Sequence, residues 1–168
     1  MLSYNIFSEN IYDDWEIDEK KYIDLAKKIL KFYLSLEDVY KKSCLQDYDY
    51  DTISFDFLFC SSRKTHEINI EYRNKDYPAD IITFAIFADS EDKFVFDGEI
   101  NLGEVIIALD KVIEESIKKD VTKEYELAFL ISHGILHLLG FDHQTEEDYN
   151  FVIDLQNKAL ESIGYDKI

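Results

Sequence analysis

The sequence is short of the residues that make linkers and disulfide frameworks. Its 168 residues include one proline and five glycines, which leaves little material for flexible connections. The two cysteines, Cys44 and Cys60, make no disulfide framework and lack metal-site spacing. The first ten residues have neither the basic start nor the apolar run of a signal peptide. We therefore expect one compact cytoplasmic domain over residues 1–168, with reduced thiols.

Long apolar runs and positive charge are also scarce. The longest apolar-rich stretch, Leu127 to Phe141, contains two histidines and is too short to span a bilayer. The formal net charge is −18, from 36 acidic and 18 basic residues, which argues against a general nucleic-acid binder. We expect neither a membrane nor DNA as a partner. The only arginines, Arg63 and Arg73, cluster with Lys64 and Lys75, and this segment predicts a local positive site suited to oxyanions.

Apolar and aromatic residues are abundant, and their spacing predicts the fold. They make up 46% of the chain, with twelve Phe and twelve Tyr, enough for a substantial core. The periodicities predict, in order, a strand (2–7), a helix (18–34), a polar loop (41–51), a strand (52–59), a helix from 61 or 62 towards 72, strands at 80–88 and 104–109, and three helices, the second ending near 139. The run at 80–88 is typical of a strand buried on both faces. This order predicts an α/β fold with a small mixed sheet packed against several helices.

Three of the four histidines lie within eleven residues, at a spacing typical of a metal site. His133 and His137 are four apart on a predicted helix and project from one face. Gly140 can make the turn that ends this helix, and His143 follows as a third ligand. The pattern H-x-x-x-H-x-x-G-x-x-H is the metzincin ligand spacing. It predicts one divalent ion on this late helix and its turn, with a position open for catalysis. Zinc is the default, while nickel, copper and cobalt stay open.

The residue after His133 argues against the protease that this spacing first suggests. Zinc peptidases carry a glutamate there as general base, whereas this chain has Gly134. A zinc-dependent peptidase or another hydrolase remains an alternative. Asp142, before the third histidine, either orients a ligand or caps the next helix.

The stretch "HGILHLLGFDH" resembles the signature of the YbeY-type endoribonucleases, the rRNA maturation factors. Upstream, "INIEYRNKDYPADIITFAIF" and "NLGEVIIAL" resemble two further segments of that family, so the likeness covers Asn69 to His143. The chain departs from the family pattern at six positions, none of them a predicted ligand: Asn74 for Gly, Ala79 for Thr, Thr83 for Ser, Ala85 for Pro, Glu104 for Asp and Ala108 for Ser.

The resemblance implies an endonuclease that cuts single-stranded RNA. It implies a role in maturing the 3′ end of small-subunit rRNA and in ribosome quality control, with one metal ion, taken as zinc. It assigns His133, His137 and His143 as ligands and Arg73 as the functionally important arginine. We expect Arg73 to be catalytic and add Arg63 and Lys75 as candidate substrate contacts. Because the net charge is −18, we expect ribosomal proteins or an assembly GTPase to bring the chain to its RNA. The alternative within the same context is a non-catalytic ribosome-assembly factor whose metal is structural.

Overall fold

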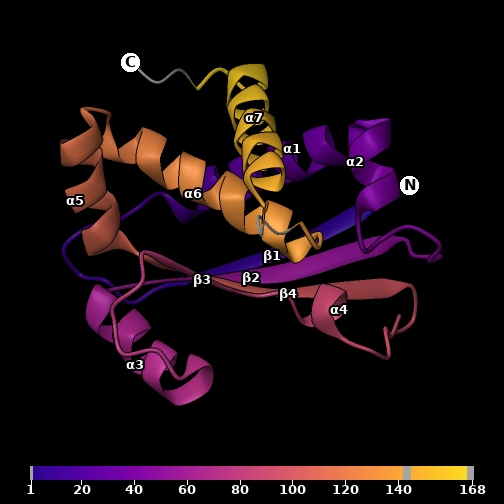
Figure 1. Ribbon diagram of the computed structural model, residues 1–168, viewed down its shortest axis with the longest axis horizontal. Helices are drawn as coiled ribbons and strands as arrows, with labels where there is room; N and C mark the ends of the chain where they lie inside the picture. Colours follow the sequence, from indigo (N-terminus) through magenta and orange to yellow (C-terminus); the bar gives the residue numbers. More distant parts are fainter. Residues whose placement is uncertain (1, 142–144, 166–168) are drawn as a thin grey trace.

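A four-stranded mixed sheet forms the middle of the molecule, with helices on both of its faces (Figure 1). The structure is a computed structural model and describes residues 2–141 and 145–165. The strands are β1 (Ser3–Asn10), β2 (Thr52–Cys60), β3 (Ile81–Phe84) and β4 (Glu99–Ala108). The helices are α1 (Glu19–Ser35), α2 (Glu37–Lys42), α3 (Ser62–Arg73), α4 (Ile86–Asp89), α5 (Leu109–Lys119), α6 (Lys123–Leu138) and α7 (Glu146–Ser162). The predicted α/β class with a mixed sheet is confirmed.

The sheet has the order β1-β2-β4-β3. β1, β2 and β4 run parallel, and β3 pairs with β4 in the antiparallel sense at the edge. Figure 1 shows α1, α6 and α7 above the sheet and α3 below it. The core lies between the sheet and the upper helices, because β2 directs Ile53, Phe55, Phe57 and Phe59 to that face and buries all four.

Helix α6 is apolar on most of its surface because the sheet, α1 and α7 surround it. Thr122 caps its start by accepting a hydrogen bond from the Tyr125 N–H (3.0 Å). Ten of its sixteen residues are buried. The row at positions 125, 129, 133 and 137 is only half-buried, and residues spaced by four share one side of a helix. The two histidines of α6 therefore lie on the side of the helix that reaches solvent.

The prediction of a strand over 80–88 that is buried on both faces is wrong in the length of the strand and in its position within the sheet. β3 ends at Phe84 and lies at the edge of the sheet, and Ile86, 58% exposed, starts the short helix α4. The backbone explains this: Gly103 in β4 has φ +133, and a Cβ there would lie 1.9 Å from the Phe84 carbonyl oxygen. The chain crosses closely over β4 at this point, so ladder pairing stops.

Two boundaries also differ from the prediction. The loop predicted from residue 41 is preceded by an unpredicted helix, α2, and β4 begins five residues before the predicted 104. Both cysteines are free thiols, as expected. In the described part of the chain, no helix is long and apolar enough to cross a membrane.

Candidate metal centre and the arginine hollow

The two histidines of α6 lie close together on the half-exposed row of the helix. The ring centroids of His133 and His137 are 4.6 Å apart, with 46° between the ring planes. Imidazole nitrogens bind zinc at about 2.0–2.1 Å, and rings this close suit two ligands of one ion. The rest of a site has to come from outside the described residues, because within residues 2–141 and 145–165 no three His, Cys, Asp or Glu side chains form a metal-binding group. The donor set fits a metal as far as the structure describes it.

The predicted end of α6 is confirmed at Gly140. This residue has φ +98, a conformation that glycine adopts without strain. Its N–H donates to the His137 carbonyl, and the Phe141 N–H donates to the Leu136 carbonyl, both at 3.0 Å, which is the Schellman pattern of a helix end. The chain therefore reverses one turn after His137. The predicted third ligand, His143, and Asp142 lie outside the described residues.

Gly134 is the point where α6 touches the sheet. A Cβ at this position would lie 2.8 Å from Cγ1 of Val105 and 3.3 Å from Cδ1 of Ile81. Real side chains do not approach that closely, so glycine is required for the helix to lie where it does. A glutamate here would meet β3 and β4 rather than solvent. Position 134, where zinc peptidases carry their glutamate base, therefore faces the sheet in this chain.

Arg73 ends α3, where Asn74 terminates the helix in the left-handed conformation (φ 54). Its side chain is exposed, and Nη1 donates to Oδ1 of Asn69 at 3.2 Å. Asn69 is fully buried, and its Nδ2 donates to the Tyr77 carbonyl at 2.8 Å. One buried amide therefore holds both the arginine and the loop that follows it, which restricts the positions the guanidinium can take.

A hollow of about 330 Å³ lies beside Arg73, between the end of α3 and α5; we call it the arginine hollow. Its lining is Arg73, Tyr77, Pro78, Ala79, Asp80, Ile81, Lys111 and Glu115. Ile81 is also the residue whose Cδ1 lies against Gly134. Ile81 therefore links the hollow to α6, because it lines the hollow and packs against Gly134, the residue after His133.

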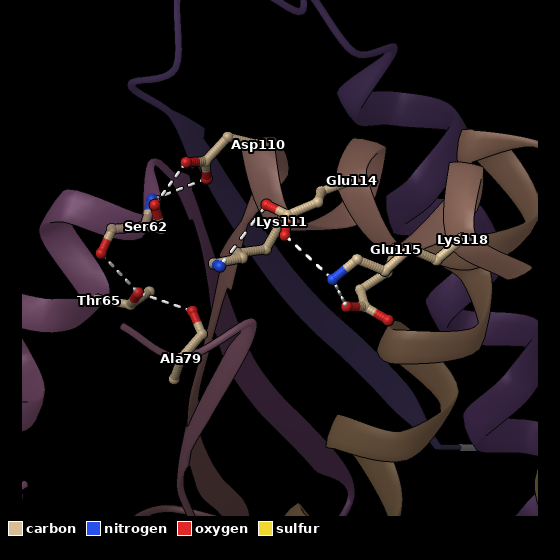
Figure 2. Close-up of polar contacts among 8 residues, drawn as sticks. All are labelled: Ser62, Thr65, Ala79, Asp110, Lys111, Glu114, Glu115 and Lys118. Carbon is tan, nitrogen blue, oxygen red and sulfur yellow. Dashed lines mark hydrogen bonds and ion pairs between the residues drawn. The ribbon is translucent and has the colours of Figure 1, made fainter. Parts of the chain in front are cut away.

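Polar contacts fasten the walls of this hollow to one another (Figure 2). The Ser62 N–H and hydroxyl donate to the Asp110 carboxylate at 2.7 and 2.5 Å, which ties the start of α3 to α5. The Thr65 hydroxyl donates to the Ala79 carbonyl at 2.7 Å, which ties α3 to the loop before β3. The Asp110 carboxylate therefore satisfies the Ser62 N–H in the first turn of α3, where the N-cap residue Ser61 makes no side-chain cap hydrogen bond.

Comparison with known proteins decides the family. A family model described as Endoribonuclease YbeY matches residues 7–164. An Endoribonuclease YbeY of Oceanobacillus iheyensis is 34% identical over 161 residues, covering 94% of this chain and 98% of the relative. One of Malacoplasma penetrans is 33% identical and covers 95% and 96%. This chain belongs to the Endoribonuclease YbeY family. The solution structure of TM1509 from Thermotoga maritima has the same fold, with a TM-score of 0.55 at 21% identity over 95% of this chain and 91% of that one.

Two carboxyls of this YbeY chain influence each other beside the arginine hollow: Asp80, which is half-buried and lines the hollow, and Glu126 of α6, which is buried. Burial raises the pKa of Asp80, with Glu115 adding to the effect and the N–H of Ile81 opposing it. Burial also raises the pKa of Glu126, which is 2% exposed, against the opposing effect of Lys119. Lys119 Nζ donates to both carboxylate oxygens of Glu126, at 2.9 and 3.0 Å. Acidic groups therefore border the hollow and limit how anionic a ligand it accepts.

The structure separates the basic residues that the sequence grouped together. Arg63 lies in the first turn of α3 and Arg73 in the last, which places them roughly 15 Å apart along the helix axis. Arg63 is 91% exposed and pairs with Glu67 at 3.9 Å. Lys75 is exposed and outside the lining of the arginine hollow. The predicted single positive site is therefore not formed, and the second cation of the hollow is Lys111.

The residues of this region that the sequence did not predict are Asn69, which positions Arg73, and Asp110, Lys111 and Glu115 of α5. Asn69 stands four residues before Arg73 on a helix, so spacing offered a weak signal. The α5 residues are about 40 positions away in the chain, and only the packing of α3 beside α5 brings them near.

Proposed function

We propose that this YbeY chain is a metal-dependent endoribonuclease that cuts single-stranded RNA and matures the 3′ end of small-subunit rRNA, with a role in ribosome quality control. The ion is one divalent metal, zinc by default, held by His133, His137 and His143. Arg73 is the catalytic arginine. The relatives' name, Endoribonuclease YbeY, supports RNA as the substrate.

The observation that carries the proposal is the histidine pair on α6, with ring centroids 4.6 Å apart, together with an arginine that Asn69 orients at a hollow whose lining residue Ile81 packs against α6. When bound, a divalent ion would polarise a phosphate oxygen and lower the pKa of water. Arg73 would donate to the non-bridging oxygens of the scissile phosphate and stabilise their charge, a role suited to a planar guanidinium. Asn69 limits the motion of that guanidinium before the substrate arrives.

Gly134 disfavours the peptidase alternative, because a side chain in its place would meet Val105 and Ile81. Arg63 and Lys75 remain outer substrate contacts in this proposal, which predicts a smaller loss on their removal than on removal of Arg73. Asp142 is proposed to orient a ligand, and ribosomal proteins or an assembly GTPase to deliver the RNA.

The test is cleavage of a labelled single-stranded RNA by metal-loaded protein. Chelation and His137→Ala are expected to abolish cutting, and Arg73→Ala to slow it by about 10²- to 10³-fold, the usual cost of losing one donor to a developing anion. Arg73→Lys keeps the charge without the planar fork and should recover only part of the rate. Circular dichroism checks that each variant is folded.

Two results would contradict the proposal. Uncut RNA with folded, metal-loaded wild-type protein would favour the non-catalytic assembly factor, above all if metal removal unfolded the chain. Equal losses for Arg63→Ala and Arg73→Ala would remove the special role given to Arg73.

A further inference from the structure

Helix α1 carries an unusual share of positive charge for so acidic a protein. It contains five lysines, Lys20, Lys21, Lys27, Lys28 and Lys31, and only two acidic residues, although the whole chain has a net charge of −18. Lys27 is half-buried and the other four are exposed. The buried side of α1 packs on the core, so these lysines form the outer, solvent-facing side of the helix.

The lysines of α1 are not engaged in ion pairs within the described part of the chain. None of the five has a described carboxylate within 4 Å, although Asp24 stands four residues from both Lys20 and Lys28. On α5, by contrast, Lys111, Lys118 and Lys119 all have carboxylate partners. Two α1 lysines lie over tyrosine rings at 5.5 Å, which leaves their charge unneutralised.

Three of these lysines line a hollow of about 450 Å³ between the start of α1 and the end of α7; we call it the lysine hollow. Its lining is Asp18, Lys20, Lys21, Asp24, Leu25, Lys28, Ile163 and Tyr165. Asp18 already accepts a hydrogen bond from the Lys21 N–H at 3.2 Å, as the cap of α1. One of the two acidic groups is therefore committed to the helix end, while three ammonium groups remain for a ligand.

We propose that the lysine hollow is a second RNA-binding site, which holds a backbone phosphate and the adjoining nucleotide of the substrate away from the metal centre. The inference rests on the proposed function, because it gives the same RNA a second contact. Lys20, Lys21 and Lys28 bind the phosphate, and Tyr165 with Ile163 offers a partly apolar surface to the base. Lysines that lack ion pairs bind phosphate without first breaking an internal bond.

The charge of the rest of the chain makes RNA the fitting occupant. A surface with net charge −18 repels a polyanion, so RNA has to approach where positive charge is locally in excess. The arginine hollow alone offers Arg73 and Lys111 against Asp80 and Glu115, which sum to no net charge. A second site with three cations against two acids would hold the strand while the metal centre acts on it.

The test compares two triple variants with the same change in net charge. Lys20→Gln/Lys21→Gln/Lys28→Gln removes the lysine hollow's cations. Lys41→Gln/Lys118→Gln/Lys158→Gln removes three lysines that are similarly exposed but paired with carboxylates and absent from the hollow's lining. Binding of a labelled single-stranded RNA is measured as a function of salt, and its cleavage by metal-loaded protein gives kcat and KM separately.

Losing the one neutralised phosphate of the lysine hollow lowers the slope of log affinity against log salt by about 0.7. Between about 50 and about 200 mM salt, the wild-type affinity should then fall about 2.6-fold more than that of the hollow variant. KM should rise with kcat retained, the control triple should match the wild type, and Lys→Arg at the same three positions should restore binding.

Identical salt slopes for the two triple variants would overturn this site while leaving the proposed function intact if the wild type still cuts RNA. Wild-type protein that neither binds nor cuts RNA would overturn both. Loss of binding to phosphatidylglycerol vesicles without loss of RNA affinity would assign the hollow to a lipid surface instead.

Discussion

Replacing Gly134 by alanine tests how closely α6 lies against the sheet. In an exposed helix interior, this change stabilises a protein by about 0.8–1 kcal/mol, because glycine is a poor helix former. Here the new methyl group would lie 2.8 and 3.2 Å from the two Cγ atoms of Val105 and 3.3 Å from Cδ1 of Ile81. Overpacking of this kind costs about 1–3 kcal/mol. We therefore expect Gly134→Ala to lower the free energy of unfolding by about 1 kcal/mol.

A second substitution makes the reasoning specific. Val105 is fully buried, and Val105→Ala alone should cost about 2 kcal/mol through lost burial and a cavity. In the double variant, the methyl group that Gly134→Ala introduces enters that space. We expect the double variant to be more stable than the sum of the two single effects by about 1–3 kcal/mol, as is usual for residues in direct contact.

The assay is urea unfolding followed by far-ultraviolet circular dichroism, with a chelator present so that metal binding adds nothing to the measured stability. A Gly134→Ala variant stabilised by about 1 kcal/mol, as on an exposed helix, would refute the contact, and so would strict additivity with Val105→Ala. Either result would mean that α6, and with it both histidines, lies farther from the sheet.

Two further predictions concern buried polar groups. Gln156 is fully buried, and among the described residues neither polar atom of its amide has a hydrogen-bond partner. Gln156→Leu should therefore raise the free energy of unfolding in urea by about 1–2 kcal/mol. The control, Asn157→Leu on the exposed side of α7, should change it by less than about 0.5 kcal/mol. Destabilisation by Gln156→Leu would show that the amide forms hydrogen bonds. Burial raises the pKa of Glu126 above its ordinary 4.5, so the folded state holds this proton more tightly than the unfolded state does. The free energy of unfolding of the wild type, relative to that of Glu126→Gln, should be greatest below about pH 4.5 and should fall as pH rises through the raised pKa. A stability difference that grows with pH would show that the bond to Lys119 dominates.

The sequence by itself determined the elements whose cause is local. Helix α1 follows from its apolar spacing and from Asp18 as cap, and α6 ends at Gly140 because only glycine reverses the chain there without strain. The proximity of His133 and His137 follows from helical geometry alone, since residues four apart share one face. The third ligand, His143, was predicted by spacing in the same way and remains a prediction.

The predictions that were wrong depend on contacts between residues or elements that the local sequence does not reveal. The apolar run at 80–88 contains no signal that it would stop pairing at Phe84, because the cause is the close approach of that carbonyl to Gly103 in another strand. The grouping of Arg63 with Arg73 assumed that neighbours in sequence are neighbours in space, and twelve residues of helix set them at opposite ends.

Only the tertiary structure decided what surrounds the candidate catalytic groups. Lys111 and Glu115 line the arginine hollow because Asp110 joins α5 to the start of α3. Three lysines of α1 line one hollow with Tyr165 because the start of α1 lies beside the end of α7. Periodicity and capping act over a few residues and can be read from a sequence. Contacts between distant segments depend on how whole elements pack, so the sequence alone determined the candidate ligand pair, and only folding determined the proposed substrate surfaces.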